Sequence, residues 1–407
     1  MMERSLFRTL TRVLDVVRDT LRGRQRAIFA HYPSRRHRIP AQFVPDIRAT
    51  DEDVEICRRL LRAYEAANAD DPSRGRPRPA DVWTHIAKRQ TTLFEALDRG
   101  DPARLAAYLC NMSRHDATQG TVQGDAEYQH LRRSRRYRRF VANMAKDKLV
   151  SLAEAVGALP SENPEQGSWG THFTIPIEDV VRRIERCLGA QISPPPIDGG
   201  FYKIGSNGGL FHERDCNAIY TAWLVNHLLP GHEPPVVCEI GGGVGRVAYW
   251  STRLGIRDYT LIDLPHINVL QGFYLLKSAP RLRVELHGEA AATGSADTDQ
   301  PQITIAPFFA RGKVRHDTFD LVLNQDSFPE INEDIVRGYL EWMATSTKFF
   351  LSINHESQPR GTGEVLQNNV AALLQDIGGY DRRLRQPYWL RRGYVMELYA
   401  VGSLAPV

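Results

Sequence analysis

The segment EIGGGVGRVAYW, residues 239–250, constrains the fold more than any other part of the chain, because four of its first seven residues are glycines and the apolar run 236–238 directly precedes it. Glycine permits a tight turn and lets backbone amides approach a ligand at contact distance. A glycine-rich turn between a buried strand and a helix is typical of open α/β sheets, which bind ligands beyond their strand ends. The pattern therefore predicts a strand, a turn that contacts a ligand, and a helix.

The second half of the chain continues this alternation of strands and helices. Short apolar runs typical of buried parallel strands occur at residues 236–240, 259–262, 303–305, 321–324 and 349–353. Two later runs, 383–388 and 394–401, alternate as expected for an antiparallel hairpin at the edge of a sheet. We therefore expect an α/β fold with a Rossmann-like, mostly parallel sheet.

The first half of the chain predicts a helical region instead. Helices are expected at residues 6–21, 60–67, 131–156 and 177–188, from the helical spacing of their apolar residues or from their composition. Pro72, Pro77 and Pro79, with Gly75 among them, interrupt the helical pattern. The proline run 194–196 marks the expected boundary between a helical amino-terminal region, residues 1–195, and a second domain, residues 196–407.

Composition narrows the class of protein. A chain of 407 residues with 42% hydrophobic and 25% charged residues can bury more than one core. It contains neither an apolar run of about 18 to 20 residues that could span a bilayer nor a signal-peptide core, so we expect a cytoplasmic protein. The five cysteines are scattered without a CxxC pair, which predicts reduced thiols. A net charge of +4 is too weak to indicate nucleic acid and is compatible with an acidic or phosphorylated substrate.

The glycine spacing separates several kinds of cofactor site. Gly241, Gly243 and Gly245 give ExGxGxG, whereas a dinucleotide-binding turn would carry glycine where Arg246 stands. The lysine of a phosphate-binding P-loop is also missing. Asp263 ends the next predicted strand, about 20 residues later, where an acid can accept both hydroxyls of a ribose. Together these features describe an adenosine cofactor without a pyrophosphate, as in S-adenosylmethionine (SAM) methyltransferases; an ordinary tight turn and a helix cap at Asp263 are the alternatives.

Four longer segments carry a family resemblance. They are CEIGGGVGRVAYWSTRLGIRDYTLIDLPHINVLQGFYLL, FDLVLNQDSFPEI, FFLSINHES and YWLRRGYVMELY, and they resemble the sugar O-methyltransferase family of class I SAM-dependent methyltransferases. The similarity covers most of residues 200–400, and the helical half with NPEQGSWGTHF also looks like the region that precedes such a domain. The resemblance implies a seven-stranded sheet with an antiparallel carboxy-terminal hairpin.

The resemblance also implies roles for individual residues. The methionine part of SAM would be held by Glu239, Gly241, Gly243 and Gly245, the ribose would be bound by Asp263, and Leu264 would lie against the adenine. Asn324, at the end of the fourth strand, is a further candidate for cofactor binding. His355 departs from the family pattern, because glutamine is expected at its position.

Methyl transfer to a hydroxyl needs a general base or a metal, because the hydroxyl is a weak acid. Asp326 is the first candidate for base or metal ligand, and His355, Glu330 and Glu356 follow it. Asp326 could instead cap the next helix, and His355 could be a solvated loop residue. The carboxylates suit magnesium, but nothing in their spacing requires it, so the sequence leaves metal ligands unknown.

Two surfaces bear on the acceptor and on other partners. Trp389, Arg391, Arg392 and Tyr394 could form an aromatic and basic wall for a sugar or phosphorylated acceptor, or pack as an edge hairpin. The basic run RRSRRYRR, residues 132–139, could contact RNA, but a solvated helix face is the favoured interpretation. The amino-terminal amphipathic helix could touch an anionic membrane, although docking on the chain's own domain is favoured. The oligomeric state stays open, a homodimer included.

The sequence thus predicts a SAM-dependent O-methyltransferase that modifies a hydroxyl. We expect that hydroxyl on a sugar in a polysaccharide, glycolipid or glycosylated metabolite. An enzyme that acts on a non-sugar small molecule or on RNA is the alternative, and an inactive scaffold with the same fold is another.

Overall fold

The computed structural model describes residues 39–74, 81–163, 165, 170–206, 209–229, 235–289, 300–316, 318–356 and 367–402. The helix expected over residues 6–21 and the breakers Gly75, Pro77 and Pro79 lie outside these residues. Pro72 lies inside them, in the turn that follows the first described helix.

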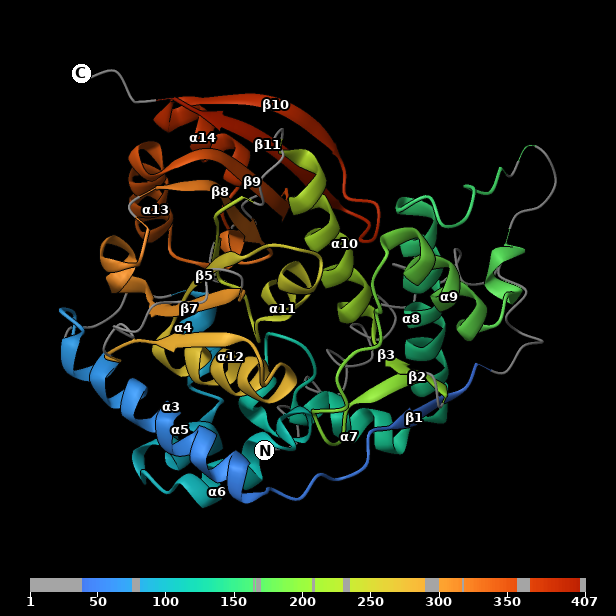
Figure 1. Cartoon of the computed structure of the whole chain (residues 1–407), viewed down its shortest axis with the longest axis horizontal. Helices are drawn as coiled ribbons and strands as arrows, with labels where there is room; N and C mark the ends of the chain where they lie inside the picture. Colours follow the sequence, from blue (N-terminus) through green and yellow to red (C-terminus); the bar gives the residue numbers. More distant parts are fainter. Residues whose placement is uncertain are drawn as a thin grey trace, which may run out of the picture.

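An eight-stranded sheet forms the centre of the second half (Figure 1). Its order is β10-β11-β9-β8-β4-β5-β7-β6. The strands are β4 (Val237–Ile240), β5 (Asp258–Asp263), β6 (Arg283–Leu286), β7 (Gln302–Pro307), β8 (Phe319–Gln325), β9 (Thr347–His355), β10 (Tyr380–Pro387) and β11 (Tyr394–Val401). The six neighbouring strands β9, β8, β4, β5, β7 and β6 pair in parallel. Strand β11 runs antiparallel to both β9 and β10. This order and these directions define a Rossmann-like class I methyltransferase fold.

The predicted strands and the carboxy-terminal hairpin are confirmed, but the expectation of seven strands is wrong. The additional strand is β6, which pairs in parallel with β7 at the edge of the sheet. Its four residues, RVEL, alternate between buried Val284 and Leu286 and half-buried Arg283 and Glu285. A segment this short carries too weak a pattern to be identified from the sequence.

Alternate residues of the central strands face two separate cores. Val237 and Leu321 belong to a core shared with α10 (Glu213–Leu228), α11 (Arg246–Arg253) and α12 (Pro265–Ser278). Cys238 and Val322 belong to a core shared with α13 (Glu333–Ser346) and α14 (Val370–Ile377) on the other face. The parallel strands are therefore buried on both sides, which explains why they are apolar throughout.

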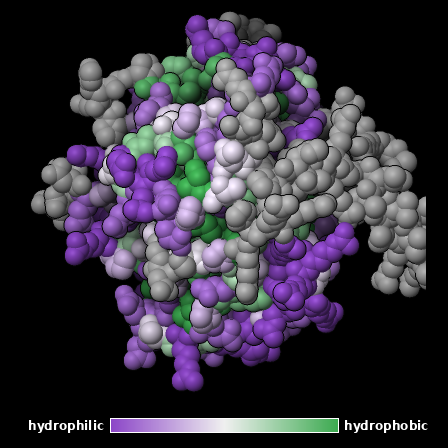
Figure 2. Space-filling view, turned by 90° about the vertical axis from the view of Figure 1, so that its right-hand side faces the viewer, coloured by the Kyte–Doolittle hydropathy of each residue, from purple (hydrophilic) through white to green (hydrophobic). Residues whose placement is uncertain are grey.

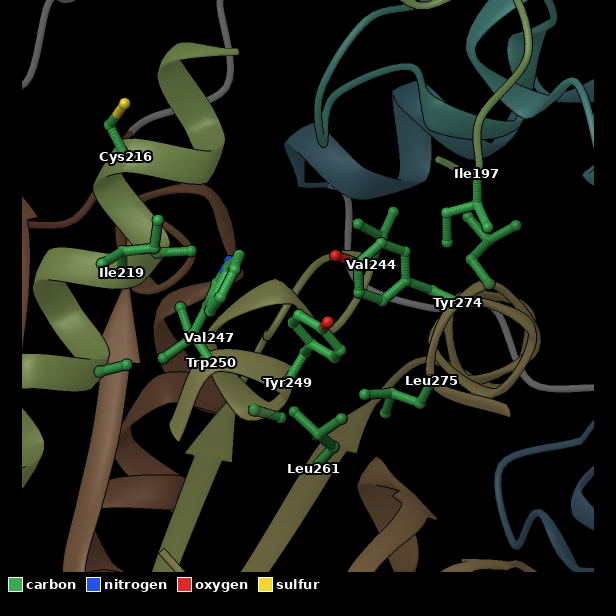
Figure 3. Packing of buried hydrophobic residues seen from close by; sticks show 14 of the residues in the cluster. Ile197, Cys216, Ile219, Val244, Val247, Tyr249, Trp250, Leu261, Tyr274 and Leu275 are labelled. Atoms are coloured by element: carbon green, nitrogen blue, oxygen red, sulfur yellow. The ribbon is translucent and has the colours of Figure 1, made fainter. Parts of the chain in front are cut away.

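Helix α11 is anchored tightly behind the glycine-rich turn. Figure 3 shows Ile219 of α10 pointing toward Val247 and Trp250 of α11. These side chains are almost completely buried, with Trp250 only 1% exposed. The packing fixes where the amino-terminal end of α11, and hence the turn that precedes it, lies relative to the sheet.

The helical half packs against the sheet domain in one continuous core. It contains α3 (Asp51–Asp70), α4 (Val82–Ala87), α5 (Thr91–Asp98), α6 (Pro102–Leu109), α7 (Asp125–Arg133), α8 (Arg135–Ala155) and α9 (Ile177–Leu188). A small sheet, β1 (Ala41–Phe43), β2 (Tyr202–Ser206) and β3 (Gly209–Phe211), pairs residues from before and after the expected boundary at residue 195. The helices expected at 60–67 and 177–188 are confirmed.

The single helix expected over residues 131–156 is two helices. Ser134 separates α7 from α8, and its hydroxyl caps α8 by accepting a hydrogen bond from the amide of Tyr137 at 3.1 Å. Arg138 turns back and donates to the backbone carbonyls of Leu131 and Arg132 at the end of α7. A serine inside a charged, helix-compatible run thus acts as a cap.

Figure 2 shows the side of the molecule that carries α8 and α9 in Figure 1, where hydrophilic residues form much of the coloured surface. Within the ranges given above, no helix has both the length and the apolar character needed to cross a membrane.

Candidate active site

The glycine-rich turn joins the carboxyl end of β4 to α11. Gly241, Gly243 and Gly245 have φ angles of 75°, 56° and 86°, values that favour glycine. A Cβ atom on Gly241 would also overlap the side chain of Ser327, which follows β8. The turn therefore requires glycine for its backbone conformation and, at Gly241, for its close approach to the end of the neighbouring strand.

Asp263 lies at the carboxyl end of β5, next to the glycine-rich turn. Its carboxylate accepts hydrogen bonds from the amide of Leu264 at 2.8 Å and from the side chain of Gln271 at 2.9 Å. Burial raises the pKa of Asp263 to about 7, although these hydrogen bonds act to lower it. The sequence allowed Asp263 to be the amino-terminal cap of the next helix, but the residue in that position is Leu264, and Pro265 begins α12. The carboxylate of Asp263 instead faces a cavity.

A cavity of about 630 Å³ opens at the ends of β4 and β5, and we call it the larger cavity. Gly241, Gly243, Asp263 and Leu264 line one side of it. Apolar side chains form much of the remaining wall, among them Phe308, Ile331, Ile335 and Tyr339. Asp263 and Asp81 are the acidic groups in this largely apolar cavity, and Asp81 caps α4 by accepting a hydrogen bond from the amide of Thr84 at 2.7 Å. A carboxylate among apolar side chains is the arrangement expected for a flat aromatic base joined to a sugar with hydroxyl groups.

A second cavity of about 110 Å³, the smaller cavity, meets the larger one at Gly241, Gly243, Ser327 and Trp83, which line both. Polar side chains form part of its wall, among them Glu239, Gln325, Asp326 and Arg391. Three buried polar atoms that line it have no hydrogen-bond partner among the described residues: Arg214 Nε, Asn217 Oδ1 and Arg246 Nη1. These atoms, two donors and one acceptor, are enclosed by the surrounding residues.

Glu239 is buried in the smaller cavity's wall, where its carboxyl group accepts a hydrogen bond from the hydroxyl of Tyr259 at 3.0 Å. Burial raises its pKa to about 8, and the nearby Asp263 adds to this effect. Glu239 thus carries its proton at neutral pH in the absence of a cationic ligand, and a positive charge nearby would favour its ionised form.

Asp326 lines the smaller cavity and is the sequence-predicted catalytic residue that the structure places there. Its carboxylate pairs with Arg391 and accepts a hydrogen bond from the Tyr394 hydroxyl, and Arg214 Nη1 lies 3.6 Å away. Its backbone has a φ of 64°, in the left-handed region, and its amide donates to Asn354 Oδ1 at 3.0 Å. The side chain is therefore held by the β10–β11 turn, β11 and α10, and the backbone is held by β9.

Glu330 and His355 lie near this carboxylate but line neither cavity. Burial raises the pKa of Glu330 to about 7, and the negative charge of Asp326 adds to the shift. Burial lowers the pKa of His355, whose ring lies 5.5 Å from that of Tyr394. Both residues are half-buried and not freely solvated.

The two remaining sequence candidates at these strand ends have other contacts. Glu356 is exposed and forms an ion pair with Arg385 at 2.9 Å. Asn324 is completely buried, and its amide donates to the carbonyl of Ile240 and to Ser327. Neither residue lines a cavity. Asn324 therefore connects the ends of β4 and β8 and supports the glycine-rich turn from inside the protein.

Arg246, which the sequence marks only as the position lacking a glycine, forms the centre of a buried charge cluster. Its guanidinium pairs with Asp198 at 2.8 Å and Asp215 at 3.2 Å, and Lys203 lies 3.8 Å from Asp215. Burial raises the pKa of Asp198 despite the two cations. Buried ion pairs of this kind fix one arrangement of the chain, so the cluster positions α11 against α10 and the segment before β2.

The helical half supplies a wall that sequence patterns did not reveal. Trp83 of α4 lines both cavities, and Gly120, Thr121 and Val122 line the smaller one. Thr121 lies over the glycine-rich turn, 3.9 Å from the position of a Cβ atom on Gly243. Ile86 of α4 packs so closely on Gly120 that a side chain there would collide with it. These residues are separated from the turn by more than a hundred positions, and no local motif identifies them.

Among the described residues, the side chains of Glu154, Glu162 and His172 lie close enough together to bind one metal ion. These residues belong to the helical half, and none of them lines either cavity. Glu162 already accepts hydrogen bonds from the backbone amides of Gly170 and His172.

Comparison with known proteins gives distant similarities. No family model matches the chain, and no curated protein matches it in sequence. Among solved structures, the ribosomal protein L11 methylase from Lactobacillus delbrueckii subsp. bulgaricus is 10% identical, with a TM-score of 0.30 over 46% of this chain and 80% of that chain. The glycopeptide N-methyltransferase MtfA complexed with (S)-adenosyl-L-methionine is 13% identical, with a TM-score of 0.33 over 45% of this chain and 93% of that chain. At this level of similarity, the fold assignment depends on the strand order and directions given above.

Proposed function

We propose that this chain is a SAM-dependent methyltransferase that transfers a methyl group to a hydroxyl of a sugar. The observation that carries the proposal is the junction of the two cavities at Gly241, Gly243, Ser327 and Trp83. Asp263, our candidate for binding ribose, lies on one side of this junction, and a cavity with several polar side chains lies on the other. A cofactor that extends across the junction would present its reactive centre to the smaller cavity.

The residues present fit SAM along its whole length. In the larger cavity, Asp263 would accept hydrogen bonds from the ribose hydroxyls, and Leu264 with Tyr339 would contact the adenine. In the smaller cavity, Arg246 Nη1 and Arg214 Nε could donate to a carboxylate, while Asn217 Oδ1 could accept from an ammonium group. These are the two charged groups of the methionine part. The ligand would therefore bring its charged groups to side chains whose hydrogen-bonding capacity is not fully used.

When bound, SAM supplies a methyl group on a positively charged sulfur, already activated for transfer. The protein must place the acceptor hydroxyl in line with it, exclude water and take up a proton. Asp326 lies in the smaller cavity and is our candidate for the group that accepts the proton. Glu330 lies close enough to interact electrostatically with Asp326, and its ionised form would place a second negative charge near the departing proton.

A sugar acceptor is supported by the polar side chains in the smaller cavity and by the sequence resemblance. Gln325, Asp326, Arg214 and Arg391 offer both donors and acceptors, as a molecule with several hydroxyl groups requires. We propose that the helical region, residues 1–195, completes the acceptor site through Trp83 and Thr121. We further propose that the enzyme acts in the cytoplasm, in keeping with its five free cysteines.

The cofactor assignment can be tested by calorimetric titration of SAM, and separately of NAD, into the wild-type protein and two variants. Asp263→Ala removes the proposed ribose ligand, and Asp258→Ala changes an acid at the other end of the same strand. We expect SAM to bind and NAD not to bind, with affinity for SAM reduced about 10- to 100-fold by Asp263→Ala only, because hydrogen bonds to a charged group are lost. Binding of NAD, or of neither compound, would contradict the proposal.

A further inference from the structure

An arginine-rich surface lies where α7 meets α8. Five exposed arginines form what we call the arginine surface: Arg132, Arg133, Arg135, Arg136 and Arg139. Within the described part of the chain, no carboxylate lies at ion-pair distance from Arg133, Arg135 or Arg136. The break at Ser134 ends one helix and begins the next in the middle of this charged run, so two helices contribute to the surface. This density of like charge is costly unless counterions or a ligand balance it.

Residues of α7, α8 and α10 link the arginine surface with the wall of the smaller cavity. Arg214 lines that cavity, and its Nε lies 3.9 Å from Glu213 Oε1. Glu127 of α7 interacts electrostatically with both of these residues. Its carboxylate accepts a hydrogen bond from the hydroxyl of Tyr137, at 3.2 Å, in the first turn of α8. One hydrogen bond and two electrostatic interactions therefore link the wall of the smaller cavity with Tyr137, in the middle of the arginine run.

The same connection is visible along the backbone. Gly120, Thr121 and Val122 line the smaller cavity, and α7 begins three residues later at Asp125. A polymer with one residue in the smaller cavity could thus extend past α7 onto the arginine surface. A small acceptor would end at the cavity and make no use of these charges.

The two tyrosines near this surface are covered in part by neighbouring side chains, whereas His130 in α7 is exposed. Tyr128 is 7% exposed and lies beneath Arg114 and Arg132, with its ring centroid 5.5 Å and 6.0 Å from the two guanidinium carbons. Tyr137 is stacked on Phe140 with the ring centroids 6.1 Å apart. In the ranges that the structure describes, the exposed large apolar side chain is Trp389, which lies on the turn after β10. Single-stranded nucleic acid binding relies on exposed aromatic faces as well as on positive charge.

We propose that the acceptor is an anionic glycan chain and that its carboxylate, sulfate or phosphate groups bind the arginine surface while one of its sugars occupies the smaller cavity. This inference rests on the proposed function, because it extends the same acceptor site. It names a substrate class: a charged polysaccharide or oligosaccharide, and not a neutral sugar or a free metabolite. Guanidinium groups suit such a ligand, because they form paired hydrogen bonds with each of these anions.

The test compares dextran sulfate with uncharged dextran of the same chain length as ligands of the full-length protein. The variant Arg133→Glu/Arg136→Glu reverses two charges of the arginine surface. A matched control, Arg99→Glu/Arg281→Glu, makes the same change in net charge at exposed positions elsewhere. We expect dextran sulfate to bind in a salt-dependent manner and dextran not to bind, with affinity for dextran sulfate about tenfold or more weaker in the first variant and nearly unchanged in the control.

Each other outcome overturns the inference. Equal weakening in both variants would mean that net charge alone attracts the polymer, and equal binding of dextran and dextran sulfate would remove the role of charge. Tighter binding of a single-stranded RNA of equal charge, lost in the first variant only, would assign the surface to RNA. Titration of SAM into the same proteins separates this inference from the proposed function: loss of SAM binding by the wild type contradicts the function, whereas normal SAM binding with no preference for dextran sulfate contradicts the glycan alone.

Discussion

Asp326 and Arg391 form an ion pair in the wall of the smaller cavity, where it links the end of β8 to the turn between β10 and β11. Tyr394 donates a hydrogen bond to the same carboxylate, so both of its oxygens have partners. An acceptor hydroxyl that uses Asp326 as a base must share or displace these contacts. The ion pair therefore positions the carboxylate of Asp326 and also competes with the acceptor hydroxyl for it.

We predict that Asp326→Asn lowers kcat by about 100-fold or more, because the amide cannot accept the proton. The affinity for SAM should change little, because the proposed cofactor contacts lie on other residues. The measurement is a steady-state rate with an accepted substrate, together with a SAM titration of each variant. Arg391→Leu is the matched control, since it removes the other half of the ion pair. Equal losses in Asp326→Asn, Arg391→Leu and the double variant would show that only the ion pair matters.

Glu330 should make the rate depend on pH near neutrality. Burial raises its pKa to about 7, so the group is protonated below that pH and ionised above it. A negative charge on Glu330 attracts the proton that leaves the acceptor hydroxyl, and kcat is therefore expected to rise as the pH increases through about 7. The profile of Glu330→Gln should be lower and lack this rise. A wild-type rise that persists in Glu330→Gln would assign the titration to another group.

SAM binding should also weaken in acid. Burial raises the pKa of Asp263 to about 7, and the ionised carboxylate is the better acceptor for two ribose hydroxyls. The dissociation constant is therefore expected to increase as the pH falls from 8 to 6, with proton release on binding near pH 7. Calorimetry in buffers of different ionisation enthalpy measures this release. Asp263→Asn should show no such proton release, whereas a release that persists in this variant would rule out Asp263 as its source.

Structural features that depend on residues close together in the sequence were predictable from it. The strand at 236–240, the glycine turn and Asp263 follow from apolar runs, backbone requirements and the rule that ligands bind at strand ends. The carboxy-terminal hairpin follows from its alternating pattern. Each of these signals is local, which is why β11 begins and ends where it was expected.

Features that depend on distant residues were not predictable. Arg246 finds its partners Asp198 and Asp215 through the fold, and nothing in the sequence links these three positions. The same holds for Trp83 and Thr121, which reach the site from the helical half. A single sequence carries no signal for such contacts, because they are determined by how whole elements pack.

Gly241→Ala separates backbone strain from steric overlap. Gly241 has a φ of 75°, and a Cβ atom there would collide with Ser327. Gly157 provides a matched control, because its φ is 77° and a Cβ atom there would meet nothing within 4 Å. We predict that Gly157→Ala lowers the free energy of unfolding by about 1 kcal/mol, whereas Gly241→Ala costs roughly 2 to 4 kcal/mol and abolishes SAM binding.

Chemical denaturation and SAM titration of both glycine variants provide the measurements. Ser327→Ala in the Gly241→Ala background reduces the size of the obstructing side chain but leaves its Cβ atom in place. We therefore expect partial recovery of stability in this double variant. Equal destabilisation by Gly241→Ala and Gly157→Ala would mean that the overlap with Ser327 is relieved at no cost.

The buried charge cluster predicts a larger effect at Arg246. Replacing it by methionine keeps much of the side-chain volume but leaves Asp198 and Asp215 buried beside Lys203 as their remaining cation. We expect the free energy of unfolding to fall by about 3 to 5 kcal/mol, as when one partner of a buried ion pair is removed. Arg253→Met is the control, because Arg253 is exposed on the same helix, and it should cost less than about 1 kcal/mol.

The pH dependence identifies the cause of this loss. Without Arg246 the two carboxyl groups favour their neutral forms, so their pKa values in the folded state rise above those in the unfolded state. Stability of Arg246→Met should therefore fall, relative to the wild type, as the pH rises from about 4 toward 7. Adding Asp198→Asn should recover part of the loss at pH 7 and reduce its dependence on pH. A deficit that is the same at every pH would instead indicate lost packing against Phe201 and Tyr274, whose rings the guanidinium covers.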